Sequence, residues 1–235
     1  MTCVILQPSY IPWRGYFHQI QKADVFVFYD DVQYDKRGWR NRNRIKSAHG
    51  SLWLTIPVHA AGCQIHHTPL NRIAIDWQQN WHEKHLLTLQ HAYGKAPFHA
   101  RYAPLLEAHF QRRPALLADL TIDLTIALAR ALGIERTRFL RASQFNVTGS
   151  KTDRLLAILE KVGATSYLSG PSARAYIEEH KFRERGITLE YMTYDYPVYP
   201  QLHPPFDPQV SILDLLFMTG PQAPDYIWGD PCRTH

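Results

Sequence analysis

Cationic side chains are concentrated in one short segment near the start of the chain. Residues 36–46 read KRGWRNRNRIK, with six Lys or Arg in eleven positions, while residues 36–75 contain no Asp or Glu. Most of these cations are Arg, whose planar guanidinium binds phosphate or carboxylate through paired hydrogen bonds. The segment therefore predicts a site for an anionic ligand, with phosphate the expected group, on a nucleotide, a nucleotide sugar or an RNA. The six cations are Lys36, Arg37, Arg40, Arg42, Arg44 and Lys46.

Aromatic and amide residues are interleaved with these cations. In an extended segment, alternate side chains point to opposite sides. Three arginines then form a cationic edge, backed by two asparagines and a tryptophan that suit recognition of a sugar or a nucleotide. The alternative is a solvated run of charge, which is the commoner role of a basic stretch. The residues concerned are Arg40, Arg42 and Arg44 on one side, and Trp39, Asn41 and Asn43 on the other.

Two adjacent acids, Asp30 and Asp31, end the apolar run DVFVFYD at residues 24–30. Neighbouring residues of a strand point to opposite faces, so these acids are not expected to form a tight carboxylate pair. One of them is a candidate general base, or a group that positions a substrate hydroxyl or amine. The alternative is that one acid caps the turn while the other pairs with Lys36 or Arg37.

The segment QPSYIPWRGYF at 7–17 follows a predicted strand and contains the candidate ligand-binding residues Gln7, Trp13 and Arg14. Gly15 permits a close approach of a ligand to the backbone. The pattern resembles the opening of nucleotidyltransferase-type folds, in which a His-x-Gly-His turn holds ATP phosphates. Here the place of that turn is taken by residues 13–16, which contain no histidine. Standard adenylyl chemistry is therefore not expected, although Arg14 remains a candidate phosphate ligand or oxyanion stabiliser.

Histidines and helix starts supply further candidates. His82 and His85 share a predicted helix, but HExxH and HxH patterns are absent, so no metal site is expected. His85 is a candidate general base. Helix N-termini attract anions, and two are predicted near Lys151 and after Ser169 and Gly170. Ordinary capping is the alternative reading there, and neither a P-loop nor a GxSxG elbow is present.

Taken together, these segments resemble the WbqC-like proteins over nearly the whole chain. The resemblance includes residues 7–46, WLTIPV at 53–58, the Trp81-x-x-Lys84-His85 group, YGKAPF at 93–98, residues 163–177, and YPQ followed by VSILDLLFMTG. The family is associated with bacterial polysaccharide clusters, especially O-antigen. The resemblance implies a role in decorating sugars by acyl or aminoacyl transfer. The matching positions expected to matter are Gln7, Pro8, Trp13, Asp30, Asp31, Lys36, Arg37, Trp39, Asn41, Arg42, Lys84, His85, Ser169, Gly170, Tyr199, Gln201 and Asp214.

The elements that must position these residues follow from apolar runs and their period. Residues 2–6, 14–22 and 24–30 predict a β–α–β opening with a parallel strand pair, and ligands bind outside the carboxyl ends of such strands. The predicted fold class is α/β, with a mostly parallel sheet, flanking helices, a nucleotidyltransferase-like opening and a helical middle segment. Further strands are predicted at 51–58, 72–75, 136–143, 165–170 and 187–194, and helices at 76–93, 101–112, 114–132, 150–162, 171–181 and 211–219. The expected organisation is a single α/β domain, 1–235, with a helical lobe at about 76–133.

Composition narrows the class of protein. The chain has 235 residues, of which 45% are hydrophobic and 20% charged, so a folded globular protein is expected. Cys3, Cys63 and Cys232 are far apart and form no CxxC pair, so neither a disulfide framework nor a cysteine zinc site is expected. No apolar run suggests a signal peptide or a membrane span, so a cytoplasmic location is expected.

Three functions agree with these observations. The leading hypothesis is a transferase for a phosphate-bearing, nucleotide-activated amino sugar, with N-acyl or N-aminoacyl transfer. Asp30, Asp31 or His85 would accept a proton from the attacking amine. The alternatives are an ATP-dependent nucleotidyl or adenylyl transferase, and an RNA-binding module or tRNA-dependent aminoacyl transferase. The expected partner is a nucleotide sugar or another phosphorylated small molecule. The reaction also needs an acyl or aminoacyl donor, and an aminoacyl group could be supplied by tRNA. No other cofactor follows from the sequence.

Overall fold

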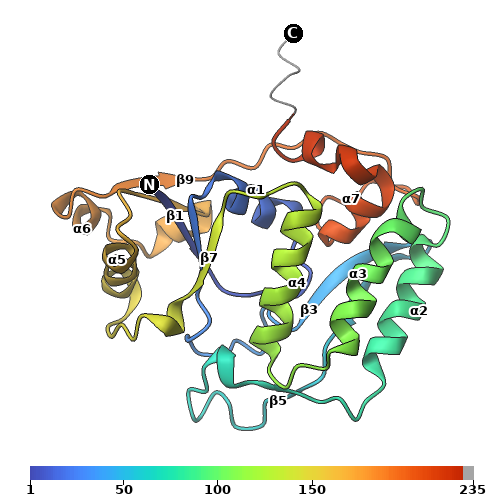
Figure 1. Ribbon diagram of the computed structural model, residues 1–235, viewed down its shortest axis with the longest axis horizontal. Coiled ribbons are helices and arrows are strands. Elements are labelled where there is room, and N and C mark those ends of the chain that lie inside the picture. The colour runs from blue at the N-terminus through green and yellow to red at the C-terminus, as the bar shows by residue number, and fades with distance from the viewer. Residues whose placement is uncertain (230–235) are drawn as a thin grey trace.

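A parallel sheet of five strands forms the centre of the protein (Figure 1). The computed structural model describes residues 1–229. The strand order is β7-β2-β1-β8-β9, and every neighbouring pair is parallel. The predicted α/β class and parallel sheet are therefore confirmed, while the nucleotidyltransferase-like opening stays a prediction. The strands are β1 (Thr2–Leu6), β2 (Val25–Phe28), β7 (Arg138–Arg141), β8 (Ser166–Ser169) and β9 (Thr188–Tyr191).

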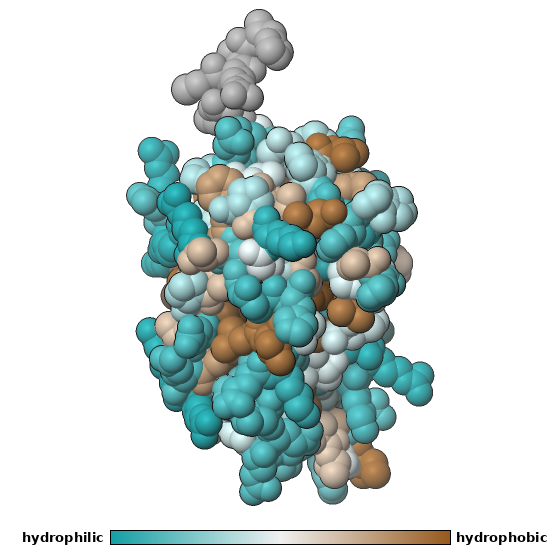
Figure 2. Space-filling view, turned by 90° about the vertical axis from the view of Figure 1, so that its right-hand side faces the viewer, coloured by the Kyte–Doolittle hydropathy of each residue, from teal (hydrophilic) through white to brown (hydrophobic). Residues whose placement is uncertain are grey.

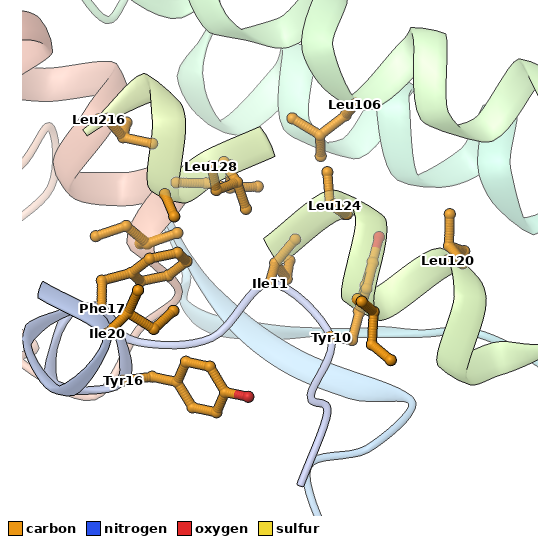
Figure 3. Packing of buried hydrophobic residues seen from close by; sticks show 14 of the residues in the cluster. Tyr10, Ile11, Tyr16, Phe17, Ile20, Leu106, Leu120, Leu124, Leu128 and Leu216 are labelled. Atoms are coloured by element: carbon orange, nitrogen blue, oxygen red, sulfur yellow. The ribbon is translucent and has the colours of Figure 1, made fainter. Parts of the chain in front are cut away.

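Both faces of the sheet are covered, which explains why its central strands are almost continuously apolar. Val25 and Val27 of β2 face a cluster with α5 (Lys151–Val162) and α6 (Glu179–Glu184). Phe26 of β2 faces the larger cluster on the opposite side, which includes α1 (Arg14–Lys22) and α4 (Leu117–Ala131). Figure 3 shows this larger cluster, in which α1 residues and α4 leucines pack around the segment after β1.

The path of the chain creates a switch point in the sheet. From β1 the chain moves through β2 to β7 at one edge, and it then returns to β8 and β9 on the other side of β1. The direction of travel changes between β1 and β8. In open α/β sheets, ligands bind at the carboxyl ends of the two strands that flank such a point. Residues after β1 and after β8 therefore meet where a ligand site is expected.

A long connection between β2 and β7 carries the middle of the chain. It contains the antiparallel hairpin β3 (Arg42–Ser47) and β4 (Gly50–Thr55), and the short pair β5 (Val58–His59) and β6 (Ala74–Ile75). The helices α2 (Trp81–Tyr93), α3 (His99–Gln111) and α4 follow and stand side by side next to the sheet (Figure 1). The C-terminal helix α7 (Ile212–Thr219) packs against α3. Within residues 1–229, no helix is both long enough and apolar enough to cross a membrane.

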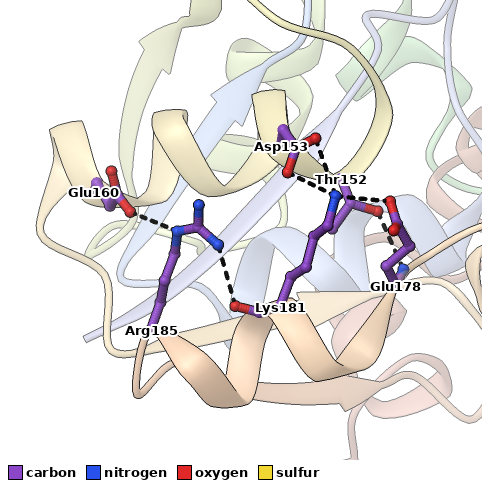
Figure 4. Close-up of polar contacts among 6 residues, drawn as sticks. All are labelled: Thr152, Asp153, Glu160, Glu178, Lys181 and Arg185. Carbon is purple, nitrogen blue, oxygen red and sulfur yellow. Dashed lines mark hydrogen bonds and ion pairs between the residues drawn. The ribbon is translucent and has the colours of Figure 1, made fainter.

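Polar contacts hold α6 on α5 (Figure 4). The ammonium of Lys181 lies 2.9 Å from Asp153 Oδ1 and 3.1 Å from Glu178 Oε1. Arg185 Nε lies 2.9 Å from Glu160 Oε1. These pairs are partly exposed, so each contributes little stability. Their effect is to orient two helices whose preceding loops reach the carboxyl edge of the sheet.

Several predicted boundaries are wrong for local reasons. The helix expected from residue 76 begins at Trp81, because Asp76 instead accepts hydrogen bonds from Gln78 and Gln79 in a turn. The helix expected at 171–181 is a 3-10 segment, Pro171–Ala175, followed by α6. The strand expected at 51–58 is interrupted after Thr55. Cys3 and Cys63 are buried free thiols, and Cys232 lies outside the described residues.

One hydrogen-bonded side chain fixes the loop that follows β1. Asn43 is buried, and its amide donates to the carbonyls of Tyr10 at 3.0 Å and Ile11 at 2.8 Å. Ile11 has φ of +38°, a conformation that a β-branched residue rarely adopts. The surrounding structure must hold this residue in place. Asn43 therefore joins the loop after β1 to the β3–β4 hairpin.

Replacing this amide tests its role in stability. In Asn43→Ala two buried carbonyls lose their donor, so the free energy of unfolding should fall by about 1–3 kcal/mol. Urea unfolding followed by circular dichroism measures the change. The exposed Gln78→Ala, whose side chain makes no hydrogen bond among the described residues, is the control and should change stability by less than about 0.5 kcal/mol. Equal stability of the two variants would contradict the assigned role.

Candidate functional site

A cavity of about 910 Å³ opens at the carboxyl ends of β1 and β8, at the switch point of the sheet. Its walls come from the loop after β1, helix α1, the segment before β3, the start of α5 and the segment after β8. This convergence brings together residues that are far apart in the sequence. The polar lining residues include Gln7, Ser9, Gln19, Arg40, Lys151 and Ser172, and the aromatic ones include Trp13, Trp39, Tyr176 and Tyr194.

Two polar side chains in the cavity wall, one buried and one half-buried, each contain a buried atom with unused hydrogen-bonding capacity. Gln19 is 4% exposed; its amide nitrogen donates to the Tyr194 hydroxyl at 2.7 Å, while its Oε1 has no partner among the described residues. Arg40 Nη1 donates to the carbonyls of Gln7 at 3.1 Å and Pro8 at 3.2 Å, and its Nε has no partner. Buried polar atoms are normally paired, so these atoms are candidate contacts for a ligand. Burial lowers the pKa of Arg40, opposed by the nearby Tyr16.

Aromatic rings line the walls and the mouth of this cavity. Trp13 contacts Tyr194 edge to face, with ring centroids 4.9 Å apart. Trp39 remains 43% exposed and lies 5.1 Å from the ring of Trp53 on β4. Tyr176 is also exposed. Exposed aromatic faces at a cavity mouth can stack on a base or a sugar ring.

The two adjacent acids have different partners. Asp30 is buried and accepts hydrogen bonds from Ser143 N at 3.0 Å and Ser143 Oγ at 2.7 Å. Asp31 Oδ2 pairs with Arg154 of α5 at 2.6 Å, and Asp31 Oδ1 has no partner among the residues that the structure describes. The expected alternative pairing with Lys36 or Arg37 is therefore wrong. Burial raises the pKa of Asp31, although Arg154 opposes the shift. Neither acid lines the cavity, but the residues on each side of the pair, Tyr29 and Val32, do.

The arginines of the hairpin are bound mainly to backbone. Arg42 Nη2 donates to Arg37 O at 2.6 Å, and its guanidinium lies 4.8 Å from the ring of Trp53. Arg44 Nη2 donates to Gln209 O at 2.9 Å. Trp39 lies 5.9 Å from the Arg44 guanidinium, on the cationic side of the segment and not beside the two asparagines. Lys36 and Arg37 have exposed side chains.

Several other predicted residues bind protein groups. Arg14 is buried, and its Nη1 donates to the carbonyls of Pro197 at 2.9 Å and Tyr226 at 3.2 Å. Asn41 donates to Ile56 O at 2.8 Å, and Gln201 donates to Asp214 Oδ1 at 2.9 Å. Ser169 is buried below the cavity, while its neighbour Gly170 lines it. Of the predicted binding residues, the structure brings to this cavity Gln7, Trp13, Trp39, Arg40, Asn43 and Gly170.

Lys84 and His85 lie elsewhere, in a second cavity of about 570 Å³ between β4 and α2. The hydroxyl of Tyr10 lies 3.0 Å from His85 Nδ1, and His85 is 6% exposed. Burial lowers the pKa of His85 from its usual 6.5 to about 4, so the ring is neutral at pH 7. The structure therefore separates His85 from the two candidate acids. Among residues 1–229, no group of three His, Cys, Asp or Glu side chains is arranged to hold a metal ion.

Sequence reasoning did not select Gln19, Tyr176 or Tyr194 as site residues. Gln19 lies three residues after Tyr16 and therefore on the same, buried side of α1. A polar residue on the apolar side of an amphipathic helix is unusual, and this was the only sign in the sequence that Gln19 belongs to a site. Tyr176 and Tyr194 belong to irregular segments after β8 and β9, whose positions depend on tertiary packing. The sequence indicates Lys151 as part of a helix N-terminus that could attract an anion, but not as a residue of this cavity.

Comparisons with known proteins agree on one family. The model of the WbqC-like protein family matches residues 7–226. The chain is also 41% identical, over 225 residues, to uncharacterized protein Rv1507c of Mycobacterium tuberculosis. That alignment covers 95% of this chain and 96% of the relative. No solved structure matches the chain significantly.

The buried His85 predicts a loss of stability in acid. Its folded pKa is about 4 and its usual value is 6.5, so between these values the unfolded chain binds more protons. Stability should therefore fall as the pH falls through this window, by about 2 kcal/mol at pH 5 from this residue alone. Urea unfolding at pH 7 and pH 5 measures the loss, which should be smaller in His85→Gln. His18, whose pKa burial also lowers, affects both proteins equally. An identical acid loss in the two proteins would show that His85 is not buried in its neutral form.

Proposed function

Because this chain belongs to the WbqC-like protein family, we propose that it is a transferase that modifies the amine of a nucleotide-activated amino sugar by N-acyl or N-aminoacyl transfer. Membership of the family suggests a polysaccharide-associated function. The observation that carries the proposal is the cavity at the switch point of the parallel sheet, which combines cations, unpaired polar atoms and aromatic faces.

Two cations on different walls of the cavity support binding of the phosphates. Arg40 precedes β3, and Lys151 is the first residue of α5. The N-terminus of α5 adds backbone N–H groups and the positive end of the helix dipole. A diphosphate between Arg40 and Lys151 would be neutralised from both sides. Among residues 1–229, no Asp or Glu lines this cavity to oppose the binding of phosphate.

The size and the aromatic lining support a sugar nucleotide as the ligand. A volume of about 910 Å³ lies within the range of roughly 300–1,000 Å³ for small-molecule and cofactor sites. Trp39 and Tyr176 have exposed rings that would pack against a base or a sugar. The unpaired Oε1 of Gln19 would accept a hydrogen bond from a ligand hydroxyl or amide.

Asp31 is the proposed proton acceptor. The sugar amine must lose a proton before its nitrogen can attack the acyl carbonyl carbon. The new N–C bond forms as the bond to the donor's leaving group breaks, and the amine proton passes to the carboxylate. Asp31 has an Oδ1 without a partner among the described residues and a pKa raised by burial, and the next residue, Val32, lines the cavity. Asp30 is less suited, because both of its oxygens accept hydrogen bonds from Ser143.

A tRNA-dependent aminoacyl transfer is the second candidate. The Trp39–Trp53 pair is exposed at the cavity mouth and is flanked by the guanidiniums of Arg42 and Arg44. Stacked aromatic and cationic groups of this kind bind unpaired nucleotides. An RNA-borne donor would bring its aminoacyl group to the same cavity.

A thermal-shift panel tests the binding proposal. The ligands are UDP-, GDP- and dTDP-linked amino sugars, ATP with and without magnesium, acyl-CoA and tRNA. One nucleotide sugar should raise the melting temperature, since a ligand at a hundred times its dissociation constant adds about 2.7 kcal/mol of apparent stability. Lys151→Ala should lose most of the shift, because it removes a cation from the phosphate site.

The matched control is Lys161→Ala, an exposed lysine in the last turn of the same helix. It should keep the full shift. A response to ATP and magnesium alone would replace this proposal with nucleotidyl transfer. A response to tRNA alone that weakens with added salt would favour the second candidate.

Replacing the proposed base tests the chemistry. Asp31→Asn should lower kcat for amide formation by about 10²–10⁴-fold while nucleotide-sugar binding persists. The wild-type rate should fall as the pH drops through the pKa of Asp31, because the protonated carboxyl cannot accept a proton. Since burial raises that pKa, the fall should begin at a higher pH than for an ordinary carboxyl. Asp123→Asn, at an exposed acid of α4, is the control. Full activity of Asp31→Asn would remove this residue from the mechanism.

A further inference from the structure

The second cavity is a separate candidate site. It lies between strand β4 and helix α2, and its volume is about 570 Å³. Its lining shares no residue with the cavity at the switch point. The aromatic and polar residues that line it include Trp53, Thr55, Trp81, Lys84, His85 and Thr88.

An exposed indole forms one wall of this cavity. Trp53 is 48% exposed, and its neighbour Leu52 is 42% exposed. The face of the protein that carries α2 is otherwise largely hydrophilic, with hydrophobic side chains gathered near its middle (Figure 2). The guanidinium of Arg42, 4.8 Å from the Trp53 ring centroid, fixes the orientation of the indole. A large exposed aromatic surface at a cavity indicates a binding surface.

Two hydrogen-bond donors of the cavity, on Lys84 and Trp81, have unused capacity among the described residues. The Lys84 ammonium makes no ion pair among the described residues. Trp81 is 4% exposed, and its indole N–H has no acceptor within residues 1–229. In the part of the chain that the structure describes, no Asp or Glu lines the cavity. A buried donor without an acceptor is uncommon, so the site is complementary to a ligand rich in acceptor oxygens.

We propose that this second cavity binds a sugar ring that carries a carboxylate, of the uronic-acid class. The C–H face of the ring would lie on Trp53, as apolar ring faces pack on indoles. The carboxylate would pair with Lys84, and ring hydroxyls would contact Thr55 and the Trp81 N–H. Lys84 is the one cation that lines the second cavity in the described part of the chain, so the charge of this cavity matches a single carboxylate. A diphosphate fits the switch-point cavity better, because Arg40 and Lys151 both line it.

The proposal goes beyond the transfer reaction and does not depend on it. The two cavities approach each other at the Trp39–Trp53 pair, where the ring centroids are 5.1 Å apart. A saccharide in the second cavity would therefore reach the mouth of the first. Either a free acidic sugar or an acidic residue within a glycan has the chemistry that the site requires.

Titration calorimetry of the full chain tests the site. The probes are glucuronic acid, an oligosaccharide of galacturonic acid, and an uncharged oligosaccharide of glucose. Saturable binding of an acidic probe is expected, weakened about tenfold or more in Trp53→Ala by loss of the stacking face. Lys84→Met should weaken acidic probes about tenfold and leave the neutral probe unchanged, because only the charge pair is lost.

The controls separate this site from the proposed reaction. Lys95→Ala, an exposed lysine just beyond α2, should bind all probes normally. Lys151→Ala, which disables the phosphate site, should also bind the acidic sugar normally. Stronger binding of the oligosaccharide than of the monosaccharide identifies a glycan as the source, and equal binding identifies the free sugar. The proposal is overturned if no acidic probe binds, if Trp53→Ala and Lys84→Met bind like the wild type, or if a nucleotide sugar displaces the probe competitively.

Discussion

The position of the loop after β1 is the constraint on which both cavities depend. This loop has no regular hydrogen-bonding pattern of its own, so buried side chains from distant segments satisfy its carbonyls. Asn43 donates to Tyr10 and Ile11, and Arg40 donates to Gln7 and Pro8. On one side the loop forms a wall of the switch-point cavity. On the other side its Tyr10 hydroxyl meets His85 in the wall of the second cavity. A single irregular segment thus sets the geometry of two sites.

The basic segment combines structural and surface roles. A run of six cations in eleven positions is ordinarily read either as a ligand site or as a solvated charge face. Here Arg40 is half-buried, lines a cavity and donates to backbone carbonyls of the loop after β1. Arg42 and Arg44 also donate to backbone carbonyls, and their guanidiniums lie beside two tryptophans. Lys36 and Arg37 remain exposed and contribute charge. The segment itself has no acid, but Asp35 lies close enough to act on Arg40, and Asp207 close enough to be acted on by Arg44 and Lys46, so acids from outside the segment partly balance its charge.

The sequence was sufficient to predict the β1–α1–β2 opening and the parallel sheet, because strands buried on both faces leave apolar runs that are visible without a structure. The sequence did not predict the start of α2, because Asp76, the expected N-cap, accepts hydrogen bonds within a turn that precedes the helix. The candidate site was only partly predictable. Gln7, Trp13 and Arg40 were selected from their types, whereas Gln19 and Tyr194 meet only after α1 packs beside the segment following β9. The sequence placed His85 on a helix, but the position of α2, away from Asp30 and Asp31, follows from packing of the long connection between β2 and β7, which no local pattern encodes.

The different environments of Asp30 and Asp31 show how a parallel sheet edge gives two identical side chains different properties. Both lie in the turn that follows β2, where their side chains take different directions. Asp30 points toward the neighbouring edge strand, where two donors from Ser143 fix it as part of the framework. Asp31 points toward α5, where Arg154 holds one oxygen and burial leaves the other unpaired. An acceptor that is held in place but incompletely hydrogen-bonded needs little reorganisation to take a proton, which is the property required of a general base. Asp31 is a candidate base because its partner, Arg154, leaves the Oδ1 atom without a hydrogen bond. Gln19 Oε1 and Arg40 Nε, in the cavity wall, are candidate ligand contacts for the same reason.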